Sequence, residues 1–156
     1  MKHEMAILLH NVRSAHNVGS IFRTADAAGV SRMFLSGYTP LPVDRFARAQ
    51  KEIAKIALGA EQHVEWLHVH GLHRSINRMK LEGWQIVGVE QSKQSVDYKK
   101  FKPKKKTLLI FGNEVRGISS ALLKKCDVIV EIPMHGKKES LNVAVTAGII
   151  LFSAQH

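Results

Sequence analysis

Short apolar segments rich in β-forming residues recur along the chain and alternate with stretches of helical periodicity. They predict strands at Met5 to Leu9, Met33 to Leu35, Val64 to Val69, Trp84 to Glu90, Thr107 to Phe111 and Val128 to Ile132. Segments of this length and composition are typical of buried strands. Helices placed between successive strands favour parallel pairing, so we expect an α/β fold with a mainly parallel sheet and helices on both faces.

The helical stretches have recognisable starts and stops. They are predicted from Asn17, as the capping residue, to about Gly29, from Asp44 to Leu58 before Gly59, from Leu72 to Leu81 before Gly83, and from about Leu141 onward. In the first helix an apolar stripe at spacings of three and four predicts the buried face, and Arg23 lies off that stripe. Arg23 is therefore placed for solvent or a ligand. The polar, lysine-rich segment 91–106 is interpreted as a linker loop.

Composition limits the size and surroundings of the protein. A chain of 156 residues, 45% of them apolar, predicts one domain over residues 1–156 with a substantial core. The formal net charge of +10 favours a polyanionic partner over general solubility alone. One cysteine, Cys126, excludes an internal disulfide and fits a cytoplasmic location. We find neither an apolar signal segment nor a run of membrane-spanning length, so no membrane partner is expected.

Two polar, glycine-containing segments follow predicted buried strands. Phe111 to Ser119 follows one strand, while Ile132 to Gly136 follows another and leads to Ser140 near the last helix. Ligands of open α/β sheets bind outside the carboxyl ends of strands, so both segments are candidates for a binding site. An ordinary strand-to-helix turn is the alternative for the first segment, and helix capping is the alternative for Ser140.

Several common types of site are not supported. The sequence contains neither the Gly-x-Gly-x-x-Gly pattern of dinucleotide-binding proteins nor the phosphate-binding loop of nucleoside triphosphatases. A Gly-x-Ser-x-Gly nucleophile motif is also missing. His68, His70 and His73 straddle a predicted strand end without cysteines or clustered carboxylates, so no metal site is expected.

Three ordered motifs together resemble the SpoU, or TrmH-like, branch of the SPOUT RNA methyltransferases. They are formed by Asn17, Gly19 and Arg23; by Gly112, Asn113, Glu114 and Gly117; and by Pro133, Met134, Gly136, Ser140, Leu141 and Asn142. The resemblance extends over almost the whole chain. It implies an α/β fold with a C-terminal trefoil knot, S-adenosyl-L-methionine as cofactor and a homodimer with the site near the subunit interface.

The resemblance also implies a reaction, namely methyl transfer to a ribose 2′-hydroxyl in tRNA or rRNA. Arg23 is the first catalytic candidate and would clamp a phosphate and stabilise the developing alkoxide, while the general base stays open. Glu114 would orient Arg23 or the ribose, with a structural ion pair as the alternative. The other polar candidates are Asn17, Ser140 and Asn142. Predicted cofactor contacts are Gly112, Asn113, Ile132, Met134, Leu141 and Asn142.

RNA is the expected partner, and no DNA partner is expected. Phosphate contacts are predicted for Arg13, Arg23, Arg116, Lys104, Lys105 and Lys137. The first alternative is a knotted RNA-binding protein without activity, which the joint presence of Arg23, Glu114 and Asn142 argues against. The second is a SPOUT enzyme that methylates a base, although the motifs match the ribose-modifying pattern.

Overall fold

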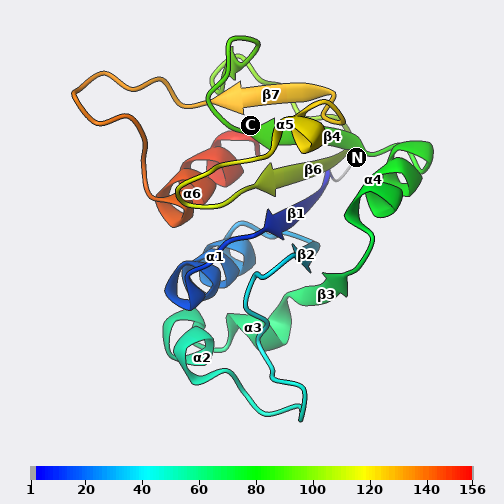
Figure 1. Ribbon diagram of the computed structural model, residues 1–156, viewed down its shortest axis with the longest axis vertical. Coiled ribbons are helices and arrows are strands. Elements are labelled where there is room, and N and C mark those ends of the chain that lie inside the picture. Colours follow the sequence, from blue (N-terminus) through cyan, green and yellow to red (C-terminus); the bar gives the residue numbers. More distant parts are fainter. Residues whose placement is uncertain (1–2, 156) are drawn as a thin grey trace.

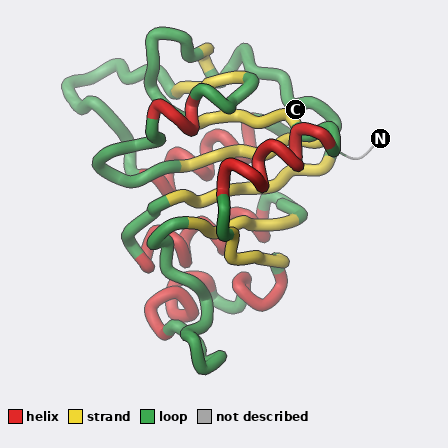
Figure 2. Tube along the Cα trace, turned by 45° about the vertical axis from the view of Figure 1, so that its right-hand side comes forward, coloured by secondary structure: helices red, strands yellow, loops and turns green. Residues whose placement is uncertain are grey.

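The computed structural model describes residues 3–155 and folds them around one seven-stranded sheet (Figures 1 and 2). The strands are β1 (Glu4–His10), β2 (Arg32–Ser36), β3 (Glu65–Val69), β4 (Gln85–Val89), β5 (Val96–Asp97), β6 (Lys106–Phe111) and β7 (Val128–Glu131). Their order is β3-β2-β1-β6-β4-β7-β5, and each neighbouring pair is parallel. The predicted fold class, an α/β protein with a mainly parallel sheet, is confirmed.

Helices cover both faces of the sheet. One face packs against α1 (Ala15–Ala27), α2 (Lys51–Ala57), α3 (Ala60–His63) and α6 (Val143–Ser153), and the other against α4 (Leu72–Leu81) and α5 (Ser120–Leu123). Successive residues of β1 point to opposite faces, so Ile7 and Leu9 join the first core and Ala6 and Leu8 the second. Burial on both sides explains why this strand is apolar from Met5 to Leu9.

The N-cap of helix α1 lies three residues before the predicted cap. Ser14 is the N-cap, and its hydroxyl accepts a hydrogen bond from the backbone N–H of Asn17 at 3.1 Å. Asn17 is therefore a buried residue of the first turn, and its prediction as the cap was wrong. Gly19 has a packing role, because a Cβ atom there would lie 2.9 Å from the carbonyl oxygen of Ile53 in α2.

The helix predicted from Asp44 to Leu58 is shorter than expected and spans only α2. The side chain of Asp44 accepts hydrogen bonds from the backbone N–H groups of Phe46 at 2.8 Å and Arg48 at 3.0 Å. These bonds fold residues 44–48 into a loop, which competes with the helix. The end of the helix was predicted well, because Leu58 and Gly59 both have positive φ angles.

Helix α6 starts at Val143 instead of near Leu141, because Asn142 is its N-cap. Residues 91–106, interpreted as a linker, include the short strand β5, which pairs with β7. Among residues 3–155, no helix is both long and apolar enough to cross a membrane. The segment after β7 loops outward and returns as α6 beside α1 (Figure 1). The trefoil knot itself stays a prediction, with which this topology is consistent.

Candidate active site

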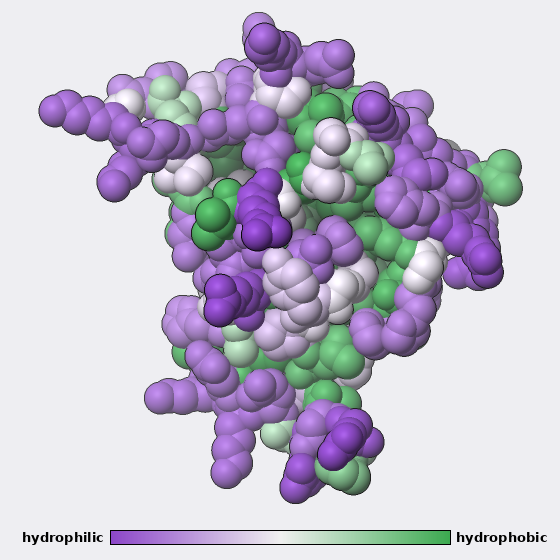
Figure 3. Space-filling view, in the orientation of Figure 1, coloured by the Kyte–Doolittle hydropathy of each residue, from purple (hydrophilic) through white to green (hydrophobic). Residues whose placement is uncertain are grey.

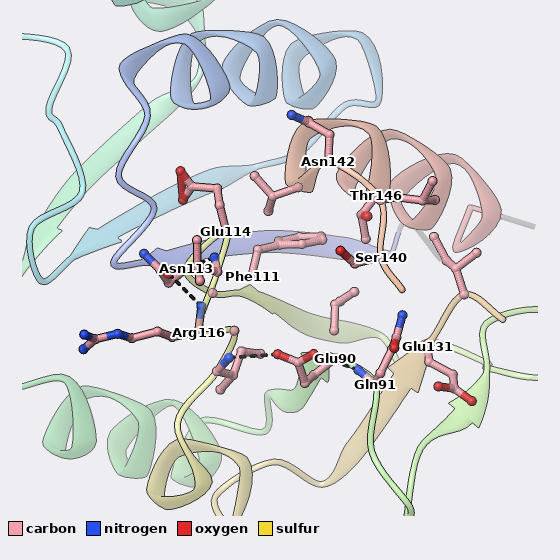
Figure 4. A pocket seen from close by; sticks show the side chains of 18 of the residues that line it. Glu90, Gln91, Phe111, Asn113, Glu114, Arg116, Glu131, Ser140, Asn142 and Thr146 are labelled. Carbon is pink, nitrogen blue, oxygen red and sulfur yellow. Dashed lines mark hydrogen bonds between the residues drawn. The ribbon is translucent and has the colours of Figure 1, made fainter. Parts of the chain in front are cut away.

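A cleft of about 470 Å³ lies at the carboxyl ends of β4, β6 and β7 (Figure 4). It is enclosed by the residues that follow β4, by the turn after β6 and by the segment that joins β7 to α6. Glu114, Arg116 and Ser140 line it. The lining also includes all six residues predicted to contact the cofactor, namely Gly112, Asn113, Ile132, Met134, Leu141 and Asn142. The structure thus brings the second and third motifs together around one cavity.

The turn after β6 is tightly folded around Asn113. Backbone hydrogen bonds join Asn113 and Gly117 in both directions, at 2.9 and 3.2 Å. The Asn113 side-chain oxygen accepts from the backbone N–H groups of Val115 at 2.9 Å and Arg116 at 2.8 Å. A Cβ atom on Gly112 would lie 2.5 Å from the carbonyl oxygen of Gly117. The asparagine and both glycines of this motif are therefore required by the shape of the turn.

Glu114 joins this turn to the start of α1. Its two carboxylate oxygens accept hydrogen bonds from the backbone N–H groups of Arg13 at 2.8 Å and Ser14 at 3.0 Å. A negative charge at a helix N-terminus is also favoured by the helix dipole. The structure shows neither the predicted contact between Glu114 and Arg23 nor an ion pair of Glu114 within residues 3–155. Glu114 instead fixes the backbone that precedes the first motif.

Asn142 joins the third motif to the first. Its side-chain oxygen accepts from the backbone N–H groups of Ala144 at 2.8 Å and Val145 at 3.3 Å, which caps α6. Its side-chain nitrogen donates to the side-chain oxygen of Asn17 in α1 at 3.2 Å. Figure 4 shows Asn142 pointing from α6 toward α1. Because Asn142 performs the capping, Ser140 is left in the cavity wall without a capping role.

Arg23 is exposed on α1, as its position off the apolar stripe predicted. It lies outside the lining of the cleft, as does Asn17. Asn17 is nevertheless linked to the cleft through Asn142, whereas Arg23 is connected to it only by the helix that both residues share. In a single chain the structure therefore gathers the cofactor-contact candidates in the cleft and leaves the main catalytic candidate, Arg23, outside the cleft lining.

The cleft combines apolar walls with available backbone donors. Leu141 is 41% exposed, and Ile132 and Met134 are half-buried. Within residues 3–155, the backbone N–H groups of these three residues donate to no protein acceptor. Apolar side chains beside unpaired backbone amides suit a flat heteroaromatic ring with hydrogen-bonding edges.

Two polar residues that the motifs did not predict hold the walls of the cleft. Glu90, directly after β4, accepts a hydrogen bond from the backbone N–H of Ile118 at 2.9 Å. Its neighbour Gln91 donates from its side chain to the carbonyl oxygen of Glu139 at 2.6 Å. The adjacent pair, labelled in Figure 4, therefore anchors the turn after β6 and the segment that joins β7 to α6. A polar pair directly after a buried strand was the available sequence signal.

The predicted phosphate contacts fall in two regions. Arg13, Arg116 and Lys137 are exposed on the loops around the cleft, and Figure 4 shows Arg116 pointing away from the cavity. Lys104 and Lys105 precede β6, at the opposite edge of the sheet. Hydrophilic residues occupy most of the margin of the face drawn in Figure 3. Three of the predicted phosphate contacts thus lie on loops around the cleft, but Lys104 and Lys105 are separated from it.

The second and third motifs meet in a cleft at the carboxyl ends of parallel strands, which is where open α/β sheets bind their ligands. The family model for the SpoU rRNA methylases matches residues 4–152. The chain belongs to the SpoU rRNA methylase family.

Individual relatives agree with this assignment. A tRNA (guanosine(18)-2′-O)-methyltransferase of Aquifex aeolicus is 33% identical over 156 aligned residues, which cover 97% of this chain and 69% of the relative. A Staphylococcus epidermidis protein assigned to the TrmH family of tRNA/rRNA methyltransferases is 32% identical over 97% of this chain. This chain spans 58% of that relative's length.

Solved structures show the same fold. An S-adenosylmethionine-bound rRNA methyltransferase from Sinorhizobium meliloti superposes with a TM-score of 0.87 at 30% identity, covering 99% of this chain and 57% of that one. The TrmH/SpoU tRNA-modifying enzyme of A. aeolicus gives a TM-score of 0.85 at 32% identity, with coverages of 99% and 75%. The predicted SpoU/TrmH-like family is confirmed.

Proposed function

We propose that this protein is an S-adenosyl-L-methionine-dependent RNA methyltransferase that methylates a ribose 2′-hydroxyl in tRNA or rRNA. The observation that carries the proposal is the convergence of the second and third motifs on one cleft, with Asn142 hydrogen-bonded to Asn17 of the first motif. Membership of the SpoU rRNA methylase family supports the same reaction. The A. aeolicus relative, named as a 2′-O-methyltransferase of tRNA, supports the substrate class.

The cleft fits the proposed cofactor by its chemistry. The unpaired backbone N–H groups of Ile132, Met134 and Leu141 would hold the edge of an adenine ring, and the Leu141 side chain would cover its face. Gly112 would let the backbone approach closely, because it carries no Cβ atom. When bound, S-adenosyl-L-methionine supplies an activated methyl group.

The polar residues divide into contact and positioning roles. Arg23, exposed on α1 and always protonated, would hold an RNA phosphate and stabilise negative charge at the ribose 2′-oxygen. Glu114 already accepts two backbone N–H groups, so we assign it to positioning Arg13 and Ser14. Asn142 positions α6 against α1, and Ser140 is available to contact a ligand in the cleft.

We further propose that the protein acts in the cytoplasm. We also propose that it forms a homodimer through the outer face of α6. This helix is apolar on all sides, and Val145 and Phe152 remain 52% and 47% exposed in the single chain. A helix that is hydrophobic all round is expected to be buried. Val145→Asp with Phe152→Asp should lower the molar mass measured by light scattering from dimer to monomer. An unchanged mass would contradict this interface.

Incubation of the purified protein with methyl-labelled S-adenosyl-L-methionine and unmodified total RNA, followed by alkaline hydrolysis, tests the reaction. Ribose methylation blocks cleavage after the modified nucleotide, so label is expected in alkali-resistant dinucleotides. Label in mononucleotides would instead identify a base methyltransferase. RNA binding without any label would favour the non-catalytic alternative.

A further inference from the structure

Tyr38 is an exposed aromatic residue that is held in place at both ends. It lies in the loop after β2, and 57% of its surface is exposed. Its backbone N–H donates to the side-chain oxygen of Asn11 at 3.1 Å. Its phenolic oxygen accepts a hydrogen bond from the side-chain nitrogen of Asn113 at 3.0 Å. The ring is thus fixed while much of its surface stays in solvent.

These contacts connect Tyr38 directly to the wall of the cleft. Asn113 lines the cavity, and its side-chain nitrogen also donates to the backbone carbonyl of Asn11 at 3.0 Å. Asn11 has a φ of 57°, a left-handed conformation that asparagine adopts more readily than most residues. Hydrogen bonds therefore join Tyr38, Asn11 and Asn113 into one cluster at the wall of the cleft.

The surroundings of the ring are basic. Arg13 is exposed two residues after Asn11, and Arg116, also exposed, follows Asn113 in the cleft turn. Neither forms an ion pair within residues 3–155. A fixed, exposed aromatic ring held by two segments that each carry an exposed arginine is complementary to a nucleobase with its flanking phosphates.

We propose that the exposed ring of Tyr38 is a stacking platform for a base of the substrate RNA next to the methylated ribose. This inference rests on the proposed function. The base stacks on the ring, and Arg13 and Arg116 contact the neighbouring phosphates. Stacking accepts any base, so Tyr38 contributes affinity and placement, with little sequence preference.

The test compares Tyr38→Phe, which keeps the ring and loses the hydroxyl, with Tyr38→Leu, which loses both. RNA affinity is measured by fluorescence anisotropy with unmodified total tRNA, and cofactor affinity by calorimetry with S-adenosyl-L-methionine. We expect Tyr38→Leu to weaken RNA binding and to raise the KM for RNA by about tenfold, the size of one stacking contact. Tyr38→Phe should stay within about twofold of the wild type in RNA affinity, because the ring remains. Both variants should bind the cofactor as the wild type does.

Three results would overturn the platform. The first is wild-type RNA affinity in Tyr38→Leu. The second is an equal loss of cofactor affinity in both variants, which would assign Tyr38 to bracing Asn113. The third is a change of dimer to monomer in Tyr38→Leu, which would show that a second copy covers the ring. Wild-type protein that binds tRNA but transfers no methyl group would contradict the proposed function, and the anisotropy comparison would still decide the role of Tyr38.

Discussion

The side chain of Asn142, at the start of α6, donates a hydrogen bond to the side chain of Asn17 in α1 at 3.2 Å. The two residues are 125 positions apart in sequence and belong to different motifs. Since Asn142 also caps α6, one amide group holds two helices and one end of the cleft. The geometry of the site therefore depends on this pair as much as on either motif.

Asn142→Ala should lower the free energy of unfolding by about 1 kcal/mol, the usual cost of losing an N-cap. It also removes the bridge to Asn17, so cofactor affinity should fall as well. Asn142→Ser keeps a capping oxygen and should recover the stability but not the bridge. Urea unfolding and calorimetry measure the two effects. Equal losses of stability in both variants would contradict the capping role.

Glu114→Gln should impair the reaction without unfolding the protein. Its amide oxygen can accept one of the two backbone N–H groups, so either Arg13 or Ser14 loses its partner. We expect kcat/KM for methyl transfer to decrease by about tenfold, which corresponds to 1.4 kcal/mol of transition-state stabilisation. Glu139→Gln, an exposed carboxylate near the same cleft, is the matched control and should be silent. Full activity of Glu114→Gln would exclude the positioning role.

Arg23→Ala should abolish methyl transfer and leave cofactor affinity within about twofold of the wild type, because charge stabilisation is lost while the pocket is intact. The expectation for the cofactor follows from the position of Arg23 on α1, outside the cleft lining. Single-turnover transfer and calorimetry with S-adenosyl-L-methionine give the two quantities. A large loss of cofactor affinity would show that the arginine belongs to the pocket instead.

Gly117→Ala should weaken cofactor binding by about tenfold through strain in the cleft turn. The residue has a φ of 67°, and a Cβ atom there would collide with the carboxylate of Glu90. Gly136→Ala is the matched control, since a Cβ atom there meets nothing within 4 Å. Calorimetry with S-adenosyl-L-methionine measures the cofactor affinity of the two variants. Similar affinities would mean that the turn tolerates the change.

Cys126 should react slowly in the folded protein. Burial raises the pKa of its thiol to about 11, so the reactive thiolate is scarce at pH 8. Unfolding restores an ordinary pKa and exposes the sulfur, so alkylation by iodoacetamide should be at least about tenfold faster in denaturant. Mass spectrometry over time measures both rates. Equal rates would show that the thiol is accessible in the folded state.

Most elements were predictable because local periodicity and burial agree. The central strands β1, β4 and β6 are buried on both faces, and α4 was predicted with its observed boundaries at Leu72 and Leu81. Errors occurred where a polar side chain competes with the backbone: Asp44 folds a loop out of a predicted helix, and Ser14 starts α1 before Asn17. Such competition depends on atomic distances, which periodicity does not contain.

The sequence by itself determined the parallel α/β class, the family motifs and six of the residues that line the cleft, because these depend on residue type and spacing along the chain. Tertiary structure decided which motif residues meet. It joined Asn142 to Asn17 and assigned Glu114 to the start of α1, and it placed Tyr38 against Asn113. It also placed Lys104 before the amino end of β6, away from the cleft at the carboxyl ends of the strands. The physical reason is that strand order and loop paths set the distances between residues that are remote in sequence.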